Sequence, residues 1–239
     1  MSDRRAQKGR DQSSIEPWSP RRIRRLANDL DRVYGSPRLH NKLGALDELM
    51  FILLSSRTGE KVYLGTYECL RREFPNWEGI LDSESTHVTR CIGRGGLARK
   101  KERWIRGTIE SLTRREGKAD LGFLNDMNDE DAEDYLTSLP GIGLKSARCI
   151  LMYSLDRAVF PVDTHCRRVF SRLGIIKRER LTDQVQDEIQ SMIPLEVRYS
   201  LHVNTIAHGR QICLPGNPRC SACFLSRRCS MFWAIKSAD

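Results

Sequence analysis

The 239-residue sequence contains no long apolar run. No segment approaches the roughly 18 consecutive apolar residues of a membrane-spanning helix, and the first residues lack the apolar core of a secretory signal peptide. We therefore expect a protein that makes no contact with a membrane and stays in the cytoplasm.

Strand patterns are absent as well, because no segment alternates apolar and polar residues over several positions. Helical spacing is present instead, first at Ile23, Leu26 and Leu30 and then at Leu46, Leu49, Met50, Leu53 and Leu54. Residues 1–16 are polar with no apolar face, which is typical of a disordered basic tail, so we expect ordered structure to begin near Trp18. The sequence predicts an all-α fold.

Acidic residues are too few to balance the basic ones. The chain has 31 Asp and Glu residues against 40 Lys and Arg residues, a formal net charge of +9. Such an excess raises the rate of encounter with polyanions, nucleic acids among them. A basic surface that is only solvated would have the same composition, so the charge alone leaves both interpretations open.

The segment from Asn128 to Leu155 predicts two helices joined by a tight hairpin. Asn128 can cap a first helix whose first turn holds three carboxylates, and this helix must end at Pro140. Gly141-Ile142-Gly143 then leads into the second helix, where glycines allow a close backbone approach and the amides of a helix start form a phosphate site. An ordinary αα-hairpin is the alternative interpretation.

A lysine and an aspartate stand at the starts of two successive helices. Lys145 lies in the first turn of the second hairpin helix, and Asp163 lies in Val162-Asp163-Thr164-His165, which opens another helix. The pair suits an amine nucleophile and its electrostatic partner, because a helix start and desolvation both favour the neutral amine. Alternatively, Lys145 only contacts a phosphate and Asp163 only caps its helix.

The eight cysteines fall into two groups. We interpret the scattered ones as plain core residues in a reducing compartment: Cys69, Cys91, Cys149 and Cys166. The others follow the pattern C-x6-C-x2-C-x5-C, with arginines between them: Cys213, Cys220, Cys223 and Cys229. Four thiolates at this spacing suit zinc or an iron-sulfur cluster, and the spacing does not decide between the two metals. The histidines lack ligand spacing, so we expect His165, His202 and His208 to be structural or backbone-contacting residues.

The hairpin of residues 139–147, the Val162-Asp163-Thr164-His165 segment and the cysteine block together resemble the endonuclease III family of DNA glycosylases, from about Trp18 to about Trp233. The resemblance implies a six-helix barrel domain with a helix-hairpin-helix, residues 39–157. It also implies a second helical domain, residues 17–38 and 158–239, whose four cysteines bind a [4Fe-4S] cluster. The partner would be double-stranded DNA with a damaged base or an abasic site, bound by a monomer associated with the nucleoid.

By this resemblance Lys145 attacks the sugar C1′ of a flipped nucleotide, and Asp163 assists it and stabilises the sugar cation. A Schiff base forms, and β-elimination nicks the strand. Backbone contacts would come from Gly141, Ile142, Gly143 and His165. We expect a bifunctional glycosylase and AP lyase acting on oxidised pyrimidines. The alternatives are the same fold acting on mismatched or alkylated bases, and a non-catalytic DNA-binding module.

Two positions depart from the family pattern. Arg57 stands where the family usually has a glutamine that fills the gap left by the flipped base, and Glu102 replaces a small residue. Leu97 matches a wedge residue that enters the DNA, although a core leucine would look the same in sequence. These departures leave the chemistry intact and put the lesion preference in doubt.

Overall fold

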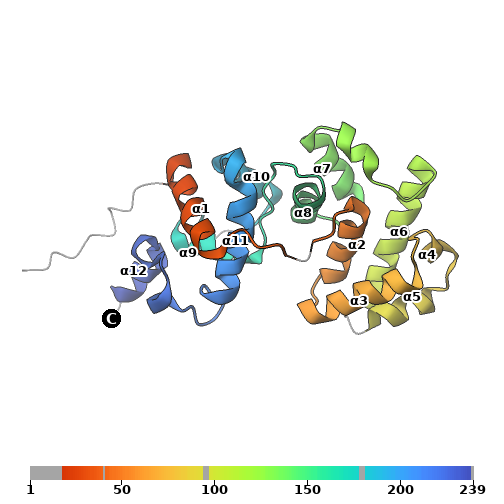
Figure 1. Cartoon of the computed structure of the whole chain (residues 1–239), viewed down its shortest axis with the longest axis horizontal. Helices are drawn as coiled ribbons and strands as arrows, with labels where there is room; N and C mark the ends of the chain where they lie inside the picture. The colour runs from red at the N-terminus through yellow and green to blue at the C-terminus, as the bar shows by residue number, and fades with distance from the viewer. Residues whose placement is uncertain (1–17, 40, 94–96, 178–180, 238–239) are drawn as a thin grey trace, which may run out of the picture. The chain divides into compact units, whose positions relative to one another are not determined.

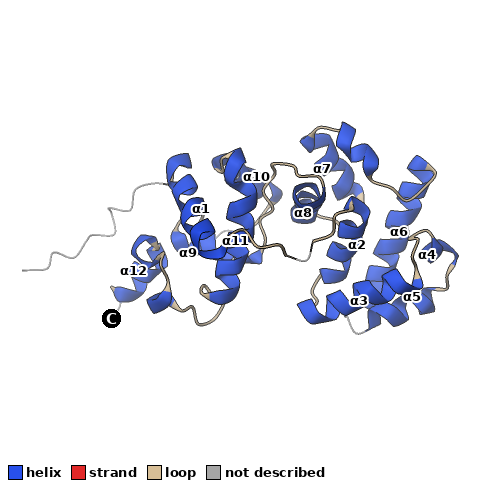
Figure 2. Ribbon diagram, in the orientation of Figure 1, coloured by secondary structure: helices blue, strands red, loops and turns tan. Residues whose placement is uncertain are grey.

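The structure is a computed structural model, which describes residues 18–39, 41–93, 97–177 and 181–237. Every regular element within these residues is a helix, as predicted (Figure 2). The predicted basic tail lies outside the described residues. None of the described helices combines the length and the apolar character needed to cross a membrane.

The chain divides into two compact units, residues 38–161 and residues 1–37 together with 162–239. These limits lie within a few residues of the predicted domain limits. The six-helix barrel expected for the first unit and the iron-sulfur cluster expected for the second stay predictions.

Residues 38–161 contain six described helices of eight or more residues (Figure 1): α2 (Ala45–Ser55), α3 (Glu60–Glu73), α5 (Ser85–Ile92), α6 (Ala98–Glu116), α7 (Asp129–Ser138) and α8 (Leu144–Ser154). Two short helices complete the unit: α4 (Gly79–Asp82) and the 3-10 helix η3 (Gly122–Asp126). The apolar stripe expected around Leu49 belongs to α2, which packs against α3, α6 and α8 and is buried over most of its length. This central helix fixes the start of α8, where Lys145 lies.

The other unit is built around α11, with α1 and α9 packed against it. Its helices are α1 (Pro20–Tyr34), α9 (Thr164–Leu173), α10 (Asp183–Met192), α11 (Arg198–Gln211) and α12 (Ser230–Lys236). Three 3-10 turns connect them: η4 (Leu195–Val197), η5 (Cys220–Ala222) and η6 (Ser226–Arg228). The predicted face of α1 is buried at Ile23, Leu26 and Leu30.

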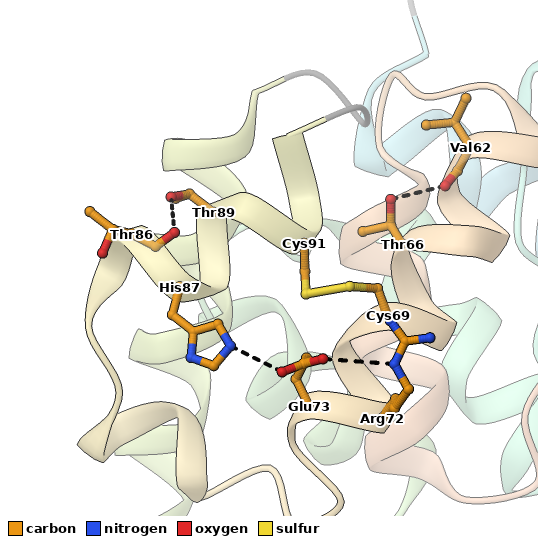
Figure 3. The surroundings of a disulfide bond; sticks show 9 residues. All are labelled: Val62, Thr66, Cys69, Arg72, Glu73, Thr86, His87, Thr89 and Cys91. Atoms are coloured by element: carbon orange, nitrogen blue, oxygen red, sulfur yellow. Dashed lines mark hydrogen bonds and ion pairs between the residues drawn. A yellow bond between two sulfur atoms is a disulfide. The ribbon is translucent and has the colours of Figure 1, made fainter.

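The expectation of four plain core cysteines is wrong for two of them. Cys69 of α3 and Cys91 of α5 form a disulfide with a Cα–Cα distance of 5.7 Å (Figure 3). The sequence pattern hides this pair because its partners lie 22 residues apart on separate helices. Cys149 and Cys166 are free and buried, as expected.

Candidate functional site

The hairpin between α7 and α8 has the predicted form. Gly141 has a φ of 82°, and a Cβ at this position would lie 2.4 Å from the ring of Trp104 in α6, so no other residue fits there. Ile142 is buried, and its amide donates to the Leu139 carbonyl at 3.2 Å. Gly143 is the N-cap residue of α8, and a Cβ at this position would meet no atom within 4 Å. Ile142 thus builds the hairpin, while Gly143 leaves room for a phosphate at the helix start.

A buried ion pair holds the two hairpin helices together. Arg148 of α8 donates from Nε and Nη2 to the two carboxylate oxygens of Glu133 in α7, at 2.9 and 3.1 Å. The Arg148 side chain is almost fully buried. Paired donors meeting paired acceptors fix orientation as well as distance, so the start of α8 is held firmly against α7.

Lys145 is half-buried in the first turn of α8, as predicted. A carboxylate in the same unit interacts with the charge of Lys145, and no pattern in the sequence indicates it. Glu48 of α2 is 1% exposed and accepts hydrogen bonds from Asn41 Nδ2 at 2.9 Å and from the Lys42 amide at 2.6 Å. Burial raises the pKa of Glu48, and the hydrogen bonds and the positive charges of Lys42 and Lys145 act against this rise. The charges of Lys145 and the buried Glu48 therefore interact electrostatically.

Asp163 caps α9 and accepts a hydrogen bond from the Cys166 amide at 2.7 Å. Two residues later, His165 is half-buried, and burial lowers its pKa. Arg168 Nη2 lies 3.0 Å from His165 Nδ1 and donates to the Gly209 carbonyl at 2.8 Å. His165 is therefore held neutral and fixed in orientation. Asp163 and His165 belong to the unit of α9, whereas Lys145 belongs to the unit of α8.

Arg57 and Leu97 share an unusual backbone conformation. Their φ angles are 51° and 53°, in the left-handed region that residues other than glycine rarely adopt. Arg57 is exposed in the turn after α2, and Leu97 is 43% exposed at the start of α6. The alternative interpretation of Leu97 as a core leucine is therefore wrong. Both side chains are accessible to a ligand.

Lys101 connects the Arg57 turn with the helix that Leu97 begins. It is 0% exposed, and its Nζ donates to the Leu54 carbonyl at 2.6 Å and to Thr58 Oγ1. These acceptors flank Arg57 on either side, and Lys101 lies in the first turn of α6. A buried cation that satisfies one of the last carbonyls of α2 and the Thr58 hydroxyl holds the turn in place.

The four predicted metal ligands line a single pocket together with His208 and Arg172: Cys213, Cys220, Cys223 and Cys229. All four are free thiols. Arg172 Nη1 donates to Cys213 Sγ at 3.2 Å, and His208 Nε2 lies 3.7 Å from Cys223 Sγ. Burial and the charges of the other three cysteines raise the pKa of Cys223 to about 11. The structure thus places the four predicted ligands around one pocket.

The four cysteine sulfurs that line this pocket are of the donor type that both a zinc ion and an iron-sulfur cluster take. The described residues contain no group of three or more His, Cys, Asp or Glu side chains arranged to hold one metal ion. A single zinc ion needs its sulfur ligands to converge within about 2.3 Å of one point, whereas a cluster of four irons takes one thiolate at each iron. Four free cysteines around one pocket meet the second requirement.

Several contacts in this region were not identified from the sequence. Arg168 Nε donates to the Cys213 carbonyl at 2.8 Å, and Arg172 donates to the Leu214 and Pro215 carbonyls, each at 2.6 Å. The two arginines thus attach the loop of the first cysteine to α9. The sequence signal for this pair is the spacing of four residues between Arg168 and Arg172, since residues at this spacing share a helix face and can contact the same loop.

Comparison with protein families gives one match that covers more than half of the chain. The model of the HhH-GPD superfamily of base excision DNA repair proteins matches residues 50–195. This range includes the hairpin, Lys145, Asp163, Arg57 and Leu97, and it ends before the four cysteines.

Curated relatives and solved structures agree with that match. Similar proteins include an Arabidopsis thaliana protein named as a candidate DNA glycosylase, 32% identical over 69% of this chain and 56% of the relative. The DNA glycosylase/AP lyase ROS1 of the same plant is 28% identical over 70% of this chain, which spans only 14% of ROS1. Endonuclease III of Thermotoga maritima is 25% identical over 88% of this chain and 93% of its own length. A solved endonuclease III–DNA complex has the same fold, with a TM-score of 0.79, 21% identity and coverage of 92% of this chain and 99% of that one.

Proposed function

Because the chain belongs to the HhH-GPD superfamily of base excision DNA repair proteins, we propose that it is a bifunctional DNA glycosylase and AP lyase that removes oxidised pyrimidines. One observation carries the proposal: Lys145 lies in the first turn of α8, directly after a hairpin that only glycine at position 141 permits. The comparison with endonuclease III and ROS1 supports the class of reaction.

In the proposed reaction the Lys145 amine attacks C1′ of a nucleotide flipped out of the duplex. The bond from C1′ to the base breaks, and the base leaves with the bonding electrons. The resulting Schiff base joins Lys145 to the opened sugar, and loss of the C2′ proton with departure of the 3′ phosphate nicks the strand. The positive end of α8 helps to keep Lys145 neutral before attack.

Asp163 supplies negative charge at the start of α9. A carboxylate near C1′ would stabilise the positive charge that develops on the sugar as the base departs, and it could accept the proton from Lys145. Its hydrogen bond from the Cys166 amide fixes one carboxylate oxygen at the helix start. The cap therefore positions Asp163 and does not exclude a catalytic role.

DNA would be held by several of the described features. The amides of Gly141 and Gly143 would contact the DNA backbone, with His165 as a second backbone contact. Arg57 and Leu97, both exposed, would enter the gap left by the flipped nucleotide. Their common support through Lys101 accounts for how two residues 40 positions apart can act at one gap.

We also propose that the four cysteines hold a [4Fe-4S] cluster. Cys213, Cys220, Cys223 and Cys229 would each bind one iron. When bound, the cluster would supply a covalent cross-link that folds the loop carrying Arg219, Arg227 and Arg228. Arg168 and Arg172 anchor this loop to α9. The exposed Arg219 and Arg227 are thus presented by a fixed framework, whereas Arg228 Nη2 donates to Asp29 at 2.7 Å.

A panel of DNA duplexes tests the proposal. Each duplex holds one defined site: an oxidised pyrimidine, a mismatched thymine, an alkylated purine or an abasic site. Base release and strand cleavage are measured separately. Release and cleavage at oxidised pyrimidines support the proposal. Release of another base would change the substrate, and binding without either product would favour a non-catalytic module.

A further inference from the structure

The disulfide joins Cys69 of α3 to Cys91 of α5, two helices that lie close to Arg57 and Leu97 along the chain. Figure 3 shows the disulfide and its surroundings. α3, which carries Cys69, begins three residues after Arg57. α5, which carries Cys91, ends five residues before Leu97. The covalent bond therefore acts on the framework that holds both proposed DNA-contacting residues.

Arg57 and Leu97 need such a framework. A positive φ in a residue other than glycine costs free energy and persists only where the surrounding structure holds it. Lys101 provides this support from α6, through its bonds to the Leu54 carbonyl and Thr58. The disulfide provides a second, covalent support from α3 and α5.

Without the disulfide, α3 and α5 remain packed but are less constrained. Leu70 of α3 and Val88 of α5 are fully buried in the common core. A polar contact between these helices beside the disulfide joins Glu73 Oε2 and His87 Nε2 at 3.2 Å, and both side chains are more than a third exposed. Exposed ion pairs contribute little because water screens them. Loss of the disulfide should therefore loosen this helix pair and leave the unit folded.

The two cysteines of the disulfide are also partly exposed. Cys69 and Cys91 are half-buried, whereas Cys149 and Cys166 are fully buried. Thiol–disulfide exchange requires that an attacking thiolate reach a sulfur, and accessible disulfides are the ones that exchange readily. The pair therefore combines access for a reductant with a place in the DNA-binding framework.

Building on the proposed function, we propose that Cys69 and Cys91 form a reversible redox site whose oxidised state favours DNA binding. Oxidation by a disulfide such as oxidised glutathione proceeds in two exchanges. One cysteine thiolate attacks a glutathione sulfur and releases one glutathione thiolate; the other cysteine then attacks the mixed disulfide and releases the second. A dithiol reverses the sequence and is itself oxidised to a cyclic disulfide. Each direction transfers two electrons.

The experiment compares the full-length protein after treatment with oxidised glutathione and after treatment with dithiothreitol. Alkylation and mass spectrometry establish the state of Cys69 and Cys91, and visible absorbance and iron content establish that the metal site is unchanged. Binding is measured on a duplex with a non-cleavable abasic-site analogue. The reduced protein should bind about 2- to 12-fold more weakly, the cost of ordering one further side chain. Its melting temperature should fall by roughly 5 to 15 °C.

Two variants make the result specific. Cys69→Ser/Cys91→Ser should match the reduced wild type under both treatments, whereas Cys149→Ala should keep the full redox response. Equal DNA affinity of the two confirmed redox states would overturn the proposal, as would a redox response that persists in the double variant. Failure of the proposed function would give a different result. Neither the oxidised nor the reduced protein would bind DNA, although the melting temperature would still fall on reduction. The proposed link between the disulfide and DNA binding would then be overturned together with the proposed function.

Discussion

The carboxylate of Glu102 lies 2.8 Å from Nε of Arg106, one turn further along α6. Glu102 is 4% exposed. Arg106 also donates to the carbonyls of Ile80, Leu81 and Ser83 at the end of α4. Glu102 thus orients an arginine that closes α4, and we therefore expect its departure from the family pattern to serve the fold and not the choice of lesion.

Replacing Glu102 should therefore reduce stability and leave lesion preference unchanged. Glu102→Ala leaves a partly buried arginine with fewer acceptors, which should lower the free energy of unfolding by about 2 to 4 kcal/mol. Urea unfolding measures this loss, and relative cleavage rates on two lesions test the preference. Glu102→Gln, which keeps the size and one acceptor, should lose less. A changed ratio of the two rates in a folded Glu102→Gln protein would contradict this interpretation.

The metal prediction concerns the four cysteines around one pocket. Protein purified without oxygen should contain roughly four irons and matching sulfide per chain. Cys223→Ser should lose iron and weaken DNA binding because the arginine-bearing loop loses its cross-link. The control is Cys149→Ala, which removes a buried cysteine of α8 and should retain full iron. Zinc without iron in the wild type would contradict the cluster.

Different substitutions separate the capping role of Asp163 from its proposed catalytic role. Asp163→Asn keeps an oxygen for the Cys166 amide, so stability should change by less than about 1 kcal/mol. Base excision should nevertheless fall by orders of magnitude, because a neutral amide does not stabilise the sugar cation. Asp163→Ala should lose the cap as well, at about 0.5 to 2 kcal/mol. The rate of single-turnover base excision and the free energy of unfolding in urea are measured for both variants. An Asp163→Asn protein with a normal excision rate would leave Asp163 only its capping role.

Arg57 should set a preference for the base opposite the lesion. Its guanidinium donates and cannot accept, so in the gap it pairs best with the O6 and N7 acceptors of guanine. Such a bidentate pair is worth about 1 to 3 kcal/mol, which predicts a roughly 5- to 150-fold preference for lesions opposite guanine over adenine. Arg57→Gln should flatten the preference and keep the lyase step.

Rates for one lesion opposite each of the four bases, at fixed salt, test the Arg57 prediction. If Arg57→Gln slows all four duplexes equally and reduces their salt dependence, Arg57 contacts only phosphate. Exposure of Arg57 in the structure allows either contact.

Local signals in the sequence predicted the parts of the site that depend on local structure. Asn128 and Asp163 both cap the helices expected of them, because an N-cap needs only a short polar side chain and the amides that follow it. Lys145 lies in the first turn of α8 because Pro140 and the glycines after it fix where that helix begins. The spacing of the four cysteines likewise predicted that they share one pocket.

The features that sequence did not reveal depend on packing between distant helices. Lys101 reaches a carbonyl 47 positions away, and Cys69 bonds to a cysteine 22 positions away. Glu48 has the pattern of an ordinary residue in a first helical turn, and only tertiary structure buries its carboxylate. No periodicity encodes such partners. Leu97 was ambiguous for the same reason, since exposed wedges and core leucines have the same sequence.

The most direct test of the account is borohydride trapping on a duplex with an abasic site. Reduction of the Schiff base should convert wild-type protein into a stable covalent adduct with DNA. Lys145→Ala should give no adduct while binding the same duplex with affinity within a few-fold of wild type. The matched control is Lys100→Ala, since Lys100 is an exposed lysine that stacks on Trp104 beneath the hairpin, and it should trap normally. Peptide mapping of the wild-type adduct should identify Lys145 as the attached residue. An undiminished adduct in Lys145→Ala, or attachment at another residue, would contradict the central claim.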